Sequence, residues 1–519
     1  MQKFSQMSMD QKSSNRVAYA ALAAAFLGWL FDGFEMGMFP LIGQPALQDL
    51  MPEASVIVRA QTFSVFIALY LVGAATGGVL FGWLGDKIGR VKAIMLAIFS
   101  YAVFTGLCGF VTHLWPFAIL RFIASLGMGG EWSLGVALVN EAWGGRDRRW
   151  MAAYIGASSN IGFMATGILS FKLNGSIDTL THSLQALHIP QQTIGYLIHN
   201  RAWRLLAISG ALPALINVFI FIFVKESHGW QEEKKTGRTD LWQTKDLYGV
   251  LIASLAALVI IYVWSPFCNI GKLGALGVSL IAALISIWGY LLPLRNYLKR
   301  LNSGSHHVVD LDRRTLKNLF IGACLASVVL LGTWGSVQQA ARWSSGIVPL
   351  GSVIPIMEYT VMASSFGSVM FAFLTPLFAD KLGRRITYAL LSTISLCAAL
   401  AFFQLNKSFV TSFEQYRFII TAFLLGGTTA SFYGFFPLYL PELFSTKLRA
   451  TGQGFCYNFG RLVAAVGTLQ LGNLTLFFSG FTQSSLQAFG NAYSVLSLVY
   501  LLGIILIWYA PETKGSELV

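Results

Sequence analysis

The sequence predicts an all-α membrane protein of about 14 spanning helices, arranged as two six-helix bundles with two further helices inserted between them. Three observations predict this fold class. Apolar residues make up 55% of the 519 positions, and charged residues only 11%. Apolar runs of spanning length follow one another along most of the chain. One short charged turn occurs twice, 294 residues apart, each time between two apolar runs.

The composition argues against a soluble protein. A soluble protein of this size carries roughly a quarter charged residues, and the mean hydropathy of this chain is +0.63. The 51 glycines and 14 prolines suit membrane helices, which pack through small residues and tolerate kinks. The five cysteines are odd in number and widely spaced, so the sequence indicates neither a disulfide framework nor a metal site.

The individual helices follow from their length, because a spanning helix needs about 20 mostly apolar residues. The first half contains six predicted helices, at residues 17–40, 60–82, 92–112, 115–139, 150–172 and 203–224. Two further helices are predicted at 247–267 and 274–294, and the last six at 318–339, 359–379, 386–405, 416–440, 450–475 and 488–509. The first run is too long for a signal peptide, so we expect it to span the membrane.

The basic residues set the topology. With the N-terminus inside, 26 of the 36 Lys and Arg fall in inside segments, as the positive-inside rule requires. The net charge of +13 is therefore explained by topology, and we expect no nucleic-acid partner. The expected location is the plasma (inner) membrane. The predicted parts are a cytoplasmic N-terminus (1–16), an N-terminal bundle (17–224), a linker with the two extra helices (225–317), a C-terminal bundle (318–509) and a cytoplasmic C-terminus (510–519).

The repeated turn carries the same charges in both copies. The first copy runs from 82 to 90 and contains Asp86, and the second runs from 376 to 384 and contains Asp380. Glycine permits the tight turn, and an aspartate beside a helix end can cap a neighbouring helix and pair with an arginine. Such contacts can form and break as two bundles rock, so we expect a gating role. The alternative is that these charges only fix the topology.

A second duplicated element accompanies the turn. Glu141 precedes Arg148 by seven residues, and Glu442 precedes Arg449 by the same spacing. Each acid ends a predicted helix on the cytoplasmic side, where it can pair with the arginines of the repeated turn. The predicted gating residues are therefore Asp86, Arg90, Glu141, Arg148, Asp380, Arg384, Glu442 and Arg449.

These motifs resemble a known family. The turn resembles the loop between helices two and three of the major facilitator superfamily, with its Asp-Arg/Lys-x-Gly-Arg core. Residues 441–452 resemble the signature of that superfamily after helix ten, and residues 511–515 the ending of sugar porters. Residues 121–131 are similar to helix four of sugar and metabolite:proton symporters, although Ser125 and Pro376 replace glycines of the family pattern. The resemblance implies a cavity between the two bundles and alternating access by rocking.

The two inserted helices narrow the resemblance to two groups. Residues 30–34 and 127–131 are similar to the first and fourth helices of the bacterial sialic acid transporter group. The fourteen-helix drug:proton antiporters usually carry a Gly-Pro motif in helix five, where residues 154–163 contain no proline. The resemblance therefore favours symport over antiport.

Ionisable residues inside predicted helices are functional candidates, because a charge in the membrane is costly. Asp32 and Glu35 are three residues apart and share a helix face, and two close carboxylates favour binding of a proton. Glu131 lies near the cytoplasmic end of its predicted helix. We expect these three acids to couple transport to protons. A structural pairing of Asp32 and Glu35, and a gating contact of Glu131, are the alternatives.

Two arginines also fall inside predicted helices. A buried cation pairs either with a substrate carboxylate or with an acid of the facing bundle, and the sequence leaves both open for Arg461. In the first case the substrate is an organic acid. The predicted substrate-binding residues are Arg121, Asn160, Trp334, Gln338, Tyr433, Asn458 and Arg461.

The sequence thus predicts proton-coupled uptake of a small polar metabolite, with a sugar acid or other organic anion first and a neutral sugar second. The expected partners are this substrate, the proton and the lipid bilayer, and we expect a monomer. The alternatives are proton-coupled efflux of drugs or metabolites, and a membrane sensor that binds a solute without moving it. No nucleophile–base set, phosphate loop or metal spacing indicates an enzyme, and we expect no cofactor.

Overall fold

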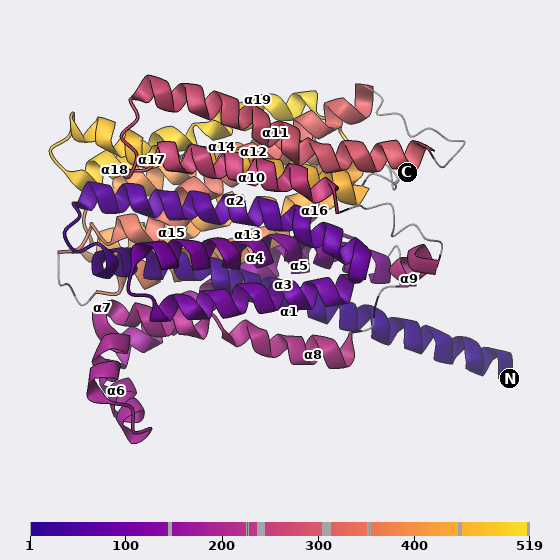
Figure 1. The fold of residues 1–519 in the computed structure, drawn as a ribbon, viewed down its shortest axis with the longest axis horizontal. Helices are drawn as coiled ribbons and strands as arrows, with labels where there is room; N and C mark the ends of the chain where they lie inside the picture. The colour runs from indigo at the N-terminus through magenta and orange to yellow at the C-terminus, as the bar shows by residue number, and fades with distance from the viewer. Residues whose placement is uncertain are drawn as a thin grey trace.

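The computed structural model describes residues 2–143, 148–224, 226, 228–235, 244–303, 313–349, 352, 354–444 and 449–515. Every regular element within these ranges is a helix. The long helices run side by side along the long axis of the molecule, and both termini lie at the same end (Figure 1).

The helices have the following bounds. The first half of the chain contains α1 (Gln2–Leu50), α2 (Val56–Ile88), α3 (Arg90–Leu107), η1 (Cys108–Phe110), α4 (Leu114–Trp143), α5 (Arg148–Gly175), α6 (Ile177–Ala186), α7 (Gln191–Ser209), η2 (Leu212–Leu215) and α8 (Ile216–Phe223). The middle contains α9 (His228–Lys235), α10 (Asp246–Val263) and α11 (Lys272–Ser303). The second half contains α12 (Arg313–Ser344), α13 (Ile356–Leu382), α14 (Arg384–Leu405), α15 (Ser412–Ala430), α16 (Phe432–Glu442), α17 (Arg449–Ser479), α18 (Ser485–Ser497), α19 (Val499–Leu506) and η4 (Ile507–Tyr509).

The two ends of the molecule are the Asp49 end and the Gly89 end. At the Asp49 end α1 finishes and α2 begins, and at the Gly89 end α2 finishes and α3 begins. Helix α6 extends beyond the body of the molecule, beside α7 (Figure 1).

Ten helices of the described residues are long and apolar enough to cross a membrane. The predicted helices at 115–139, 150–172, 203–224 and 247–267 are not among them, so the count of fourteen stays a prediction. The region 203–224 is broken into α7, η2 and α8, and Pro213 lies at the break. A proline lacks the backbone N–H that a continuous helix needs, which explains why one uninterrupted helix was a wrong prediction here.

Helix α1 is longer than the predicted 17–40. It includes both Pro40 and Pro45 and ends at Leu50, ten residues beyond the predicted end. Membrane helices tolerate proline, because neighbouring helices and side chains satisfy the freed backbone groups. The predicted helix at 416–440 is divided into α15 and α16, which meet at Ser431.

Helices from the two halves of the chain pack directly on each other. Within the first half, α1 lies against α4 and α5, and α2 against α4. Across the halves, α2 packs on α17 and α5 packs on α13. The approach of α1 to α5 requires glycine, because a Cβ on Gly33 would collide with the backbone of Ser159. Close helix contacts of this kind position the side chains described below.

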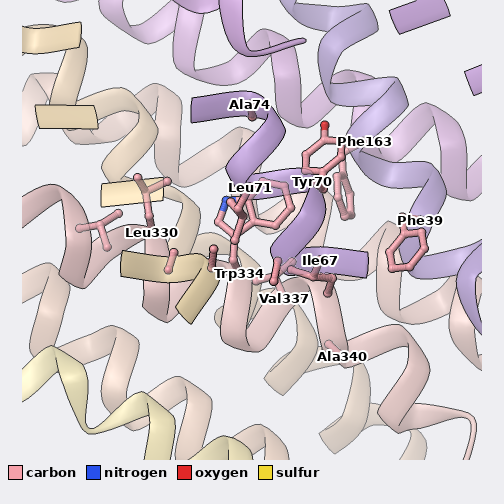
Figure 2. Packing of buried hydrophobic residues seen from close by; sticks show 14 of the residues in the cluster. Phe39, Ile67, Tyr70, Leu71, Ala74, Phe163, Leu330, Trp334, Val337 and Ala340 are labelled. Carbon is pink, nitrogen blue, oxygen red and sulfur yellow. The ribbon is translucent and has the colours of Figure 1, made fainter. Parts of the chain in front are cut away.

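The largest buried cluster draws side chains from both halves. Figure 2 shows Trp334 and Val337 of α12 beside Tyr70 and Leu71 of α2. The rings of Tyr70 and Trp334 lie 5.3 Å apart, within the range of favourable aromatic contacts. The core therefore runs across the boundary between the halves.

The inserted helices α10 and α11 pack on each other and dock onto α2. Three buried hydroxyls join them: Thr76 Oγ1 of α2 lies 2.6 Å from Ser254 Oγ of α10 and 2.9 Å from Tyr290 OH of α11. The Ser254 and Tyr290 hydroxyls are 3.0 Å apart. The same contact region includes Val79 of α2 and Leu462 of α17, so the pair lies beside the α2–α17 boundary.

Candidate functional site

A cavity of about 60 Å³ lies between helices of the first and second halves. Five predicted site residues from five helices line it: Asp32 of α1, Asn160 of α5, Trp334 of α12, Tyr433 of α16 and Arg461 of α17. Helix α4 also contributes to the wall, through Met128. The structure therefore brings together residues that are as far as 429 positions apart in the sequence.

Arg461 is a buried cation, with 5% of its surface exposed. Its NH1 nitrogen donates to the carbonyl oxygens of Ala74 at 3.1 Å and Gly129 at 3.4 Å, and to Asn458 Oδ1 at 3.2 Å. The ring of Tyr457 lies 4.9 Å from the guanidinium. Among the described residues, no carboxylate lies within 4.0 Å of it. The guanidinium is thus held by neutral oxygens of α2, α4 and α17 while it faces the cavity.

Asp32 faces the same cavity from α1 and is 6% exposed. Its Oδ1 atom has no hydrogen-bond partner among the described residues. Its electrostatic neighbours are Glu131, Glu35 and Arg461. A buried carboxylate without a partner is costly, and it is the kind of group that binds a proton or a ligand.

The uncharged members of the site differ in what they offer. The hydroxyl of Tyr433 is buried and makes no hydrogen bond with the described residues. The Asn160 side chain donates to the carbonyl oxygen of Gly156 at 2.8 Å, which leaves its own oxygen available. Asn458 does not line the cavity, but its oxygen orients Arg461. Gln338 is buried outside the cavity lining, so its prediction as a substrate ligand is not supported by its position.

Glu35 and Arg121 form a buried ion pair inside the first half. Arg121 NH1 lies 2.5 Å from Glu35 Oε1, and both side chains are at most 2% exposed. Glu35 also accepts hydrogen bonds from Tyr70 at 2.6 Å and Thr105 at 3.2 Å. Arg121 was predicted to bind substrate, but it is absent from the cavity lining, because its charge is engaged by Glu35. Glu35 likewise pairs with this arginine and not with Asp32.

Glu131 lies in a second, smaller cavity of about 10 Å³ between α1, α3, α4 and α8. Both of its carboxylate oxygens lack a hydrogen-bond partner of normal geometry among the described residues, although Tyr101 lies beside it. A Cβ on Gly28 would collide with this carboxylate, so the glycine leaves room for it. Trp29 borders both cavities and so lies between Glu131 and the central site.

The second copy of the repeated turn forms a charge network at the Gly89 end. Gly383 has a φ of 91°, which favours glycine. Arg384 donates to the two oxygens of Glu442 at 2.7 and 3.0 Å and lies 3.7 Å from Asp380. Thr513 adds a hydrogen bond of 2.5 Å to Glu442. The structure therefore brings together the three predicted residues Asp380, Arg384 and Glu442.

The first copy has the same backbone, with a φ of 111° at Gly89. Arg90 begins α3, as Arg384 begins α14. The side chains of Asp86, Glu141, Arg148 and Arg449 lie outside the described part of the structure, so their predicted gating contacts stay predictions.

Two further acids cap the helices that follow the repeated turns. Glu226 accepts from the backbone N–H of Arg90 at 2.9 Å, and Glu512 accepts from those of Arg384 at 2.9 Å and Arg385 at 3.0 Å. Partial burial raises the pKa of the Glu512 carboxyl, but these N–H groups outweigh it, and its pKa lies below its usual range. This role was not predicted from the sequence. The available signal was an acid that follows the last apolar run of each half, at 226 and 512.

The arrangement offers groups that can bind a charged or polar solute. The cavity combines one cation, one unpartnered carboxylate and aromatic walls. The described residues contain no group of three or more His, Cys, Asp or Glu side chains that could hold a metal ion.

Comparisons with known proteins identify the family of this chain. A family model described as "Major Facilitator Superfamily" matches residues 21–364. The chain is 26% identical over 493 residues to the "Probable 4-methylmuconolactone transporter" of Cupriavidus pinatubonensis, covering 95% of this chain and 90% of that protein. It is 24% identical to the "Sialic acid transporter NanX" of Escherichia coli, covering 95% of each chain.

A solved structure shows the same fold. The structure of the xylose transporter XylE from E. coli, in a partially occluded inward open conformation, matches with a TM-score of 0.62. It is 17% identical and covers 97% of this chain and 100% of its own. The chain is therefore a multi-pass transporter that belongs to the Major Facilitator Superfamily.

Proposed function

We propose that this protein takes up a small organic anion together with a proton, by alternating access of the central cavity. The two moving units are 17–224 and 318–509, joined by 225–317 with its two inserted helices. The Asp49 end faces outward, and both termini are in the cytoplasm of a cell whose plasma (inner) membrane holds the protein as a monomer. The distribution of Lys and Arg supports this orientation.

The observation that carries the proposal is the burial of the Arg461 guanidinium and the groups that surround it. It is a buried cation on a cavity wall, and no carboxylate of the described residues lies within 4.0 Å of it. A charge in a membrane protein interior favours an opposite charge. The carboxylate of a substrate supplies that charge, and two relatives whose names specify organic acids or their lactones support this substrate class.

Asp32 supplies the coupling to protons. A substrate carboxylate and an ionised Asp32 in one small cavity repel each other, so the anion binds best when Asp32 carries a proton. The loaded cavity then holds one cation and one anion, and its net charge is zero. A neutral loaded site crosses between the two open states at lower cost than a charged one.

Glu131 provides the step between Asp32 and the Gly89 end. Its small cavity is bounded by Trp29, which also borders the central cavity. A site of about 10 Å³ holds roughly one water molecule. A proton leaving Asp32 passes to Glu131 by this route while the substrate leaves through the central cavity. The Glu35–Arg121 pair fixes α1 against α4 beside this route.

Uptake into proteoliposomes with an inward proton gradient tests the proposal. The panel contains sialic acid, a muconolactone acid, short monocarboxylates and neutral hexoses. We expect gradient-driven uptake of an acid that is lost in Arg461→Gln. The control Arg417→Gln, which changes an arginine of α15 outside the cavity, retains uptake.

Two results would contradict the proposal. Uptake of a neutral hexose that survives Arg461→Gln assigns a sugar substrate and makes the arginine structural. Extrusion of solute on reversal of the gradient, with no acid uptake, assigns efflux by antiport instead.

A further inference from the structure

The backbone of α7 is distorted at the Asp49 end. Asn200, Arg201 and Ala202 have φ values of 47°, 64° and 48°, in the left-handed region that disfavours residues other than glycine. Three such residues in succession cost free energy, so the surrounding contacts must hold them in place.

One set of contacts ties this segment to α1. The carboxylate of Asp49 accepts from Asn200 Nδ2 at 2.8 Å, from Trp203 Nε1 at 2.7 Å and from Arg204 NH1 at 2.8 Å. All of these residues belong to the first half of the chain. They anchor the distorted segment within that half.

A second set of contacts crosses to the other half. The NH2 nitrogen of Arg201 lies 2.6 Å from each oxygen of Glu358, in the first turn of α13. Glu358 is 1% exposed, and it also accepts from Ser170 at 2.8 Å and Asn174 at 3.4 Å, both in α5. A buried acid of the second half is thus held by three donors of the first half.

These contacts lie between the central cavity and the Asp49 end. Nearby, Ser345, which directly follows α12, donates to Gln44 of α1 at 2.9 Å, which also joins the two halves. The Arg201–Glu358 pair therefore joins α7 to α13 across the boundary between the halves, on this side of the cavity. Arg201 is 34% exposed, so water reaches it on one side.

We propose that Arg201 and Glu358 form a latch that closes the Asp49 end, and that the distorted segment 199–202 opposes it. The inference rests on the proposed function, because it takes the protein to alternate between two open states. In the closed state Glu358 is dry and fully paired. On opening, both charges become hydrated and the backbone of 200–202 can relax. The relief of backbone strain offsets part of the lost ion pair, which keeps the two states close in free energy.

Distances between spin labels test the latch without any substrate. Labels at Glu53 and Lys407, exposed positions in the loops of the Asp49 end, report the separation of the two halves. The five native cysteines are replaced, and double electron–electron resonance is recorded in lipid nanodiscs. We expect Glu358→Gln and Arg201→Gln each to raise the ratio of long to short distances at least about tenfold. The double variant should match the single variants, because all three remove the same contact.

Two further variants separate a latch from general damage. Ser170→Ala removes one neutral donor to Glu358, so it should shift the ratio in the same direction by a smaller factor. Asp49→Asn weakens the anchor within one half and leaves the Arg201–Glu358 pair intact, so it should lower the unfolding temperature and change the ratio by much less than Glu358→Gln does.

The proposal is overturned if Glu358→Gln, Arg201→Gln and Ser170→Ala leave the ratio unchanged. It is equally overturned if Asp49→Asn shifts the ratio as much as Glu358→Gln does, or if the double variant multiplies the two single effects. Failure of acid uptake by the unaltered protein would reject the proposed function, whereas the distance ratio reports on the latch by itself.

Discussion

At the residue scale, the central feature is a cation that neutral oxygens hold in place. Arg461 is fixed by carbonyl groups of α2 and α4, so its position depends on helices of the other half. A planar guanidinium can bind both oxygens of a carboxylate, and an ammonium cannot do so in the same way. The type of cation should therefore matter as well as its charge.

We expect Arg461→Lys to retain transport with an apparent affinity for the acid about tenfold weaker, because the charge remains and the paired geometry is lost. The measurement is the concentration dependence of uptake. An unchanged affinity in the lysine variant would show that the substrate does not contact the guanidinium.

A different result is expected on substitution of Asp32, because in the proposed mechanism this residue binds the proton and not the substrate. Asp32→Asn mimics the protonated acid, so the cavity keeps its shape and its neutral loaded state. We expect exchange of labelled for unlabelled acid to continue in the variant, while gradient-driven accumulation falls to background. Accumulation that persists in Asp32→Asn would assign the proton to another group.

The carboxyl group of Glu512 should make the stability of the fold at the second repeated turn depend on pH. Its pKa lies below its usual range because the backbone N–H groups of Arg384 and Arg385 outweigh partial burial. A carboxyl group whose pKa is lower in the folded state stabilises the fold above its unfolded pKa of about 4.3, and this contribution is lost as the pH falls through the folded value. We expect Glu512→Gln to lower the unfolding temperature at pH 6 and to lower it by less at pH 3. An equal effect at both values would contradict this account.

At the element scale, the inserted helices are attached by a specific buried contact. Thr76, Ser254 and Tyr290 join α2, α10 and α11 through their hydroxyls. Hydrogen bonds between membrane helices contribute modestly, because the separated helices find other partners. The apolar contacts with Val79 and Leu462 supplement them.

We expect Tyr290→Phe to destabilise the protein by about 1 kcal/mol, since two hydrogen bonds are lost and the ring is retained. Tyr262→Phe is a matched control, because Tyr262 of α10 is 52% exposed. Thermal unfolding in one detergent compares them. Equal unfolding temperatures for Tyr290→Phe and the unaltered protein would show that apolar packing alone attaches the pair.

The repeated turn shows what sequence patterns specify well. A turn that needs glycine, with an aspartate before it and an arginine after it, is specified by a few adjacent residues. The prediction that Arg384 lies beside Asp380 and Glu442 could therefore be made from the motif, and the structure places them together. The role of Glu512 was missed because its partners are backbone N–H groups 127 and 128 residues away in the chain, so the sequence shows the acid but not what it caps.

At the scale of the whole molecule, composition and apolar run length were enough to predict a helical membrane protein. The rotation of each helix about its axis could not be predicted, because the charged residues gave no periodic pattern. For that reason Arg121 was expected in the cavity and instead pairs with Glu35, and Gln338 was expected in the cavity and instead lies outside it. The end of α1 was also misplaced, because the helix continues through Pro40 and Pro45 to Leu50. Neighbouring helices compensate for a proline inside a membrane protein.

The central cavity is small compared with the proposed substrate. A cavity of about 60 Å³ holds only a few water molecules, so the walls must separate before an organic acid can enter. The contacts at the Asp49 end oppose that movement, and the Arg384–Glu442 network lies at the other end. In the proposed cycle the two ends open in turn, and the structure is one of its states.

The central claim is that the acid and the proton move together. The most direct measurement records two quantities in the same proteoliposomes: the uptake of labelled acid, and the acidification of the interior, reported by an enclosed pH-sensitive dye. No outward gradient of the substrate acid is present. The account predicts inward proton movement that requires the acid, follows its uptake in proportion and disappears in Asp32→Asn. Acid uptake without proton movement, or with proton movement in the opposite direction, would contradict it.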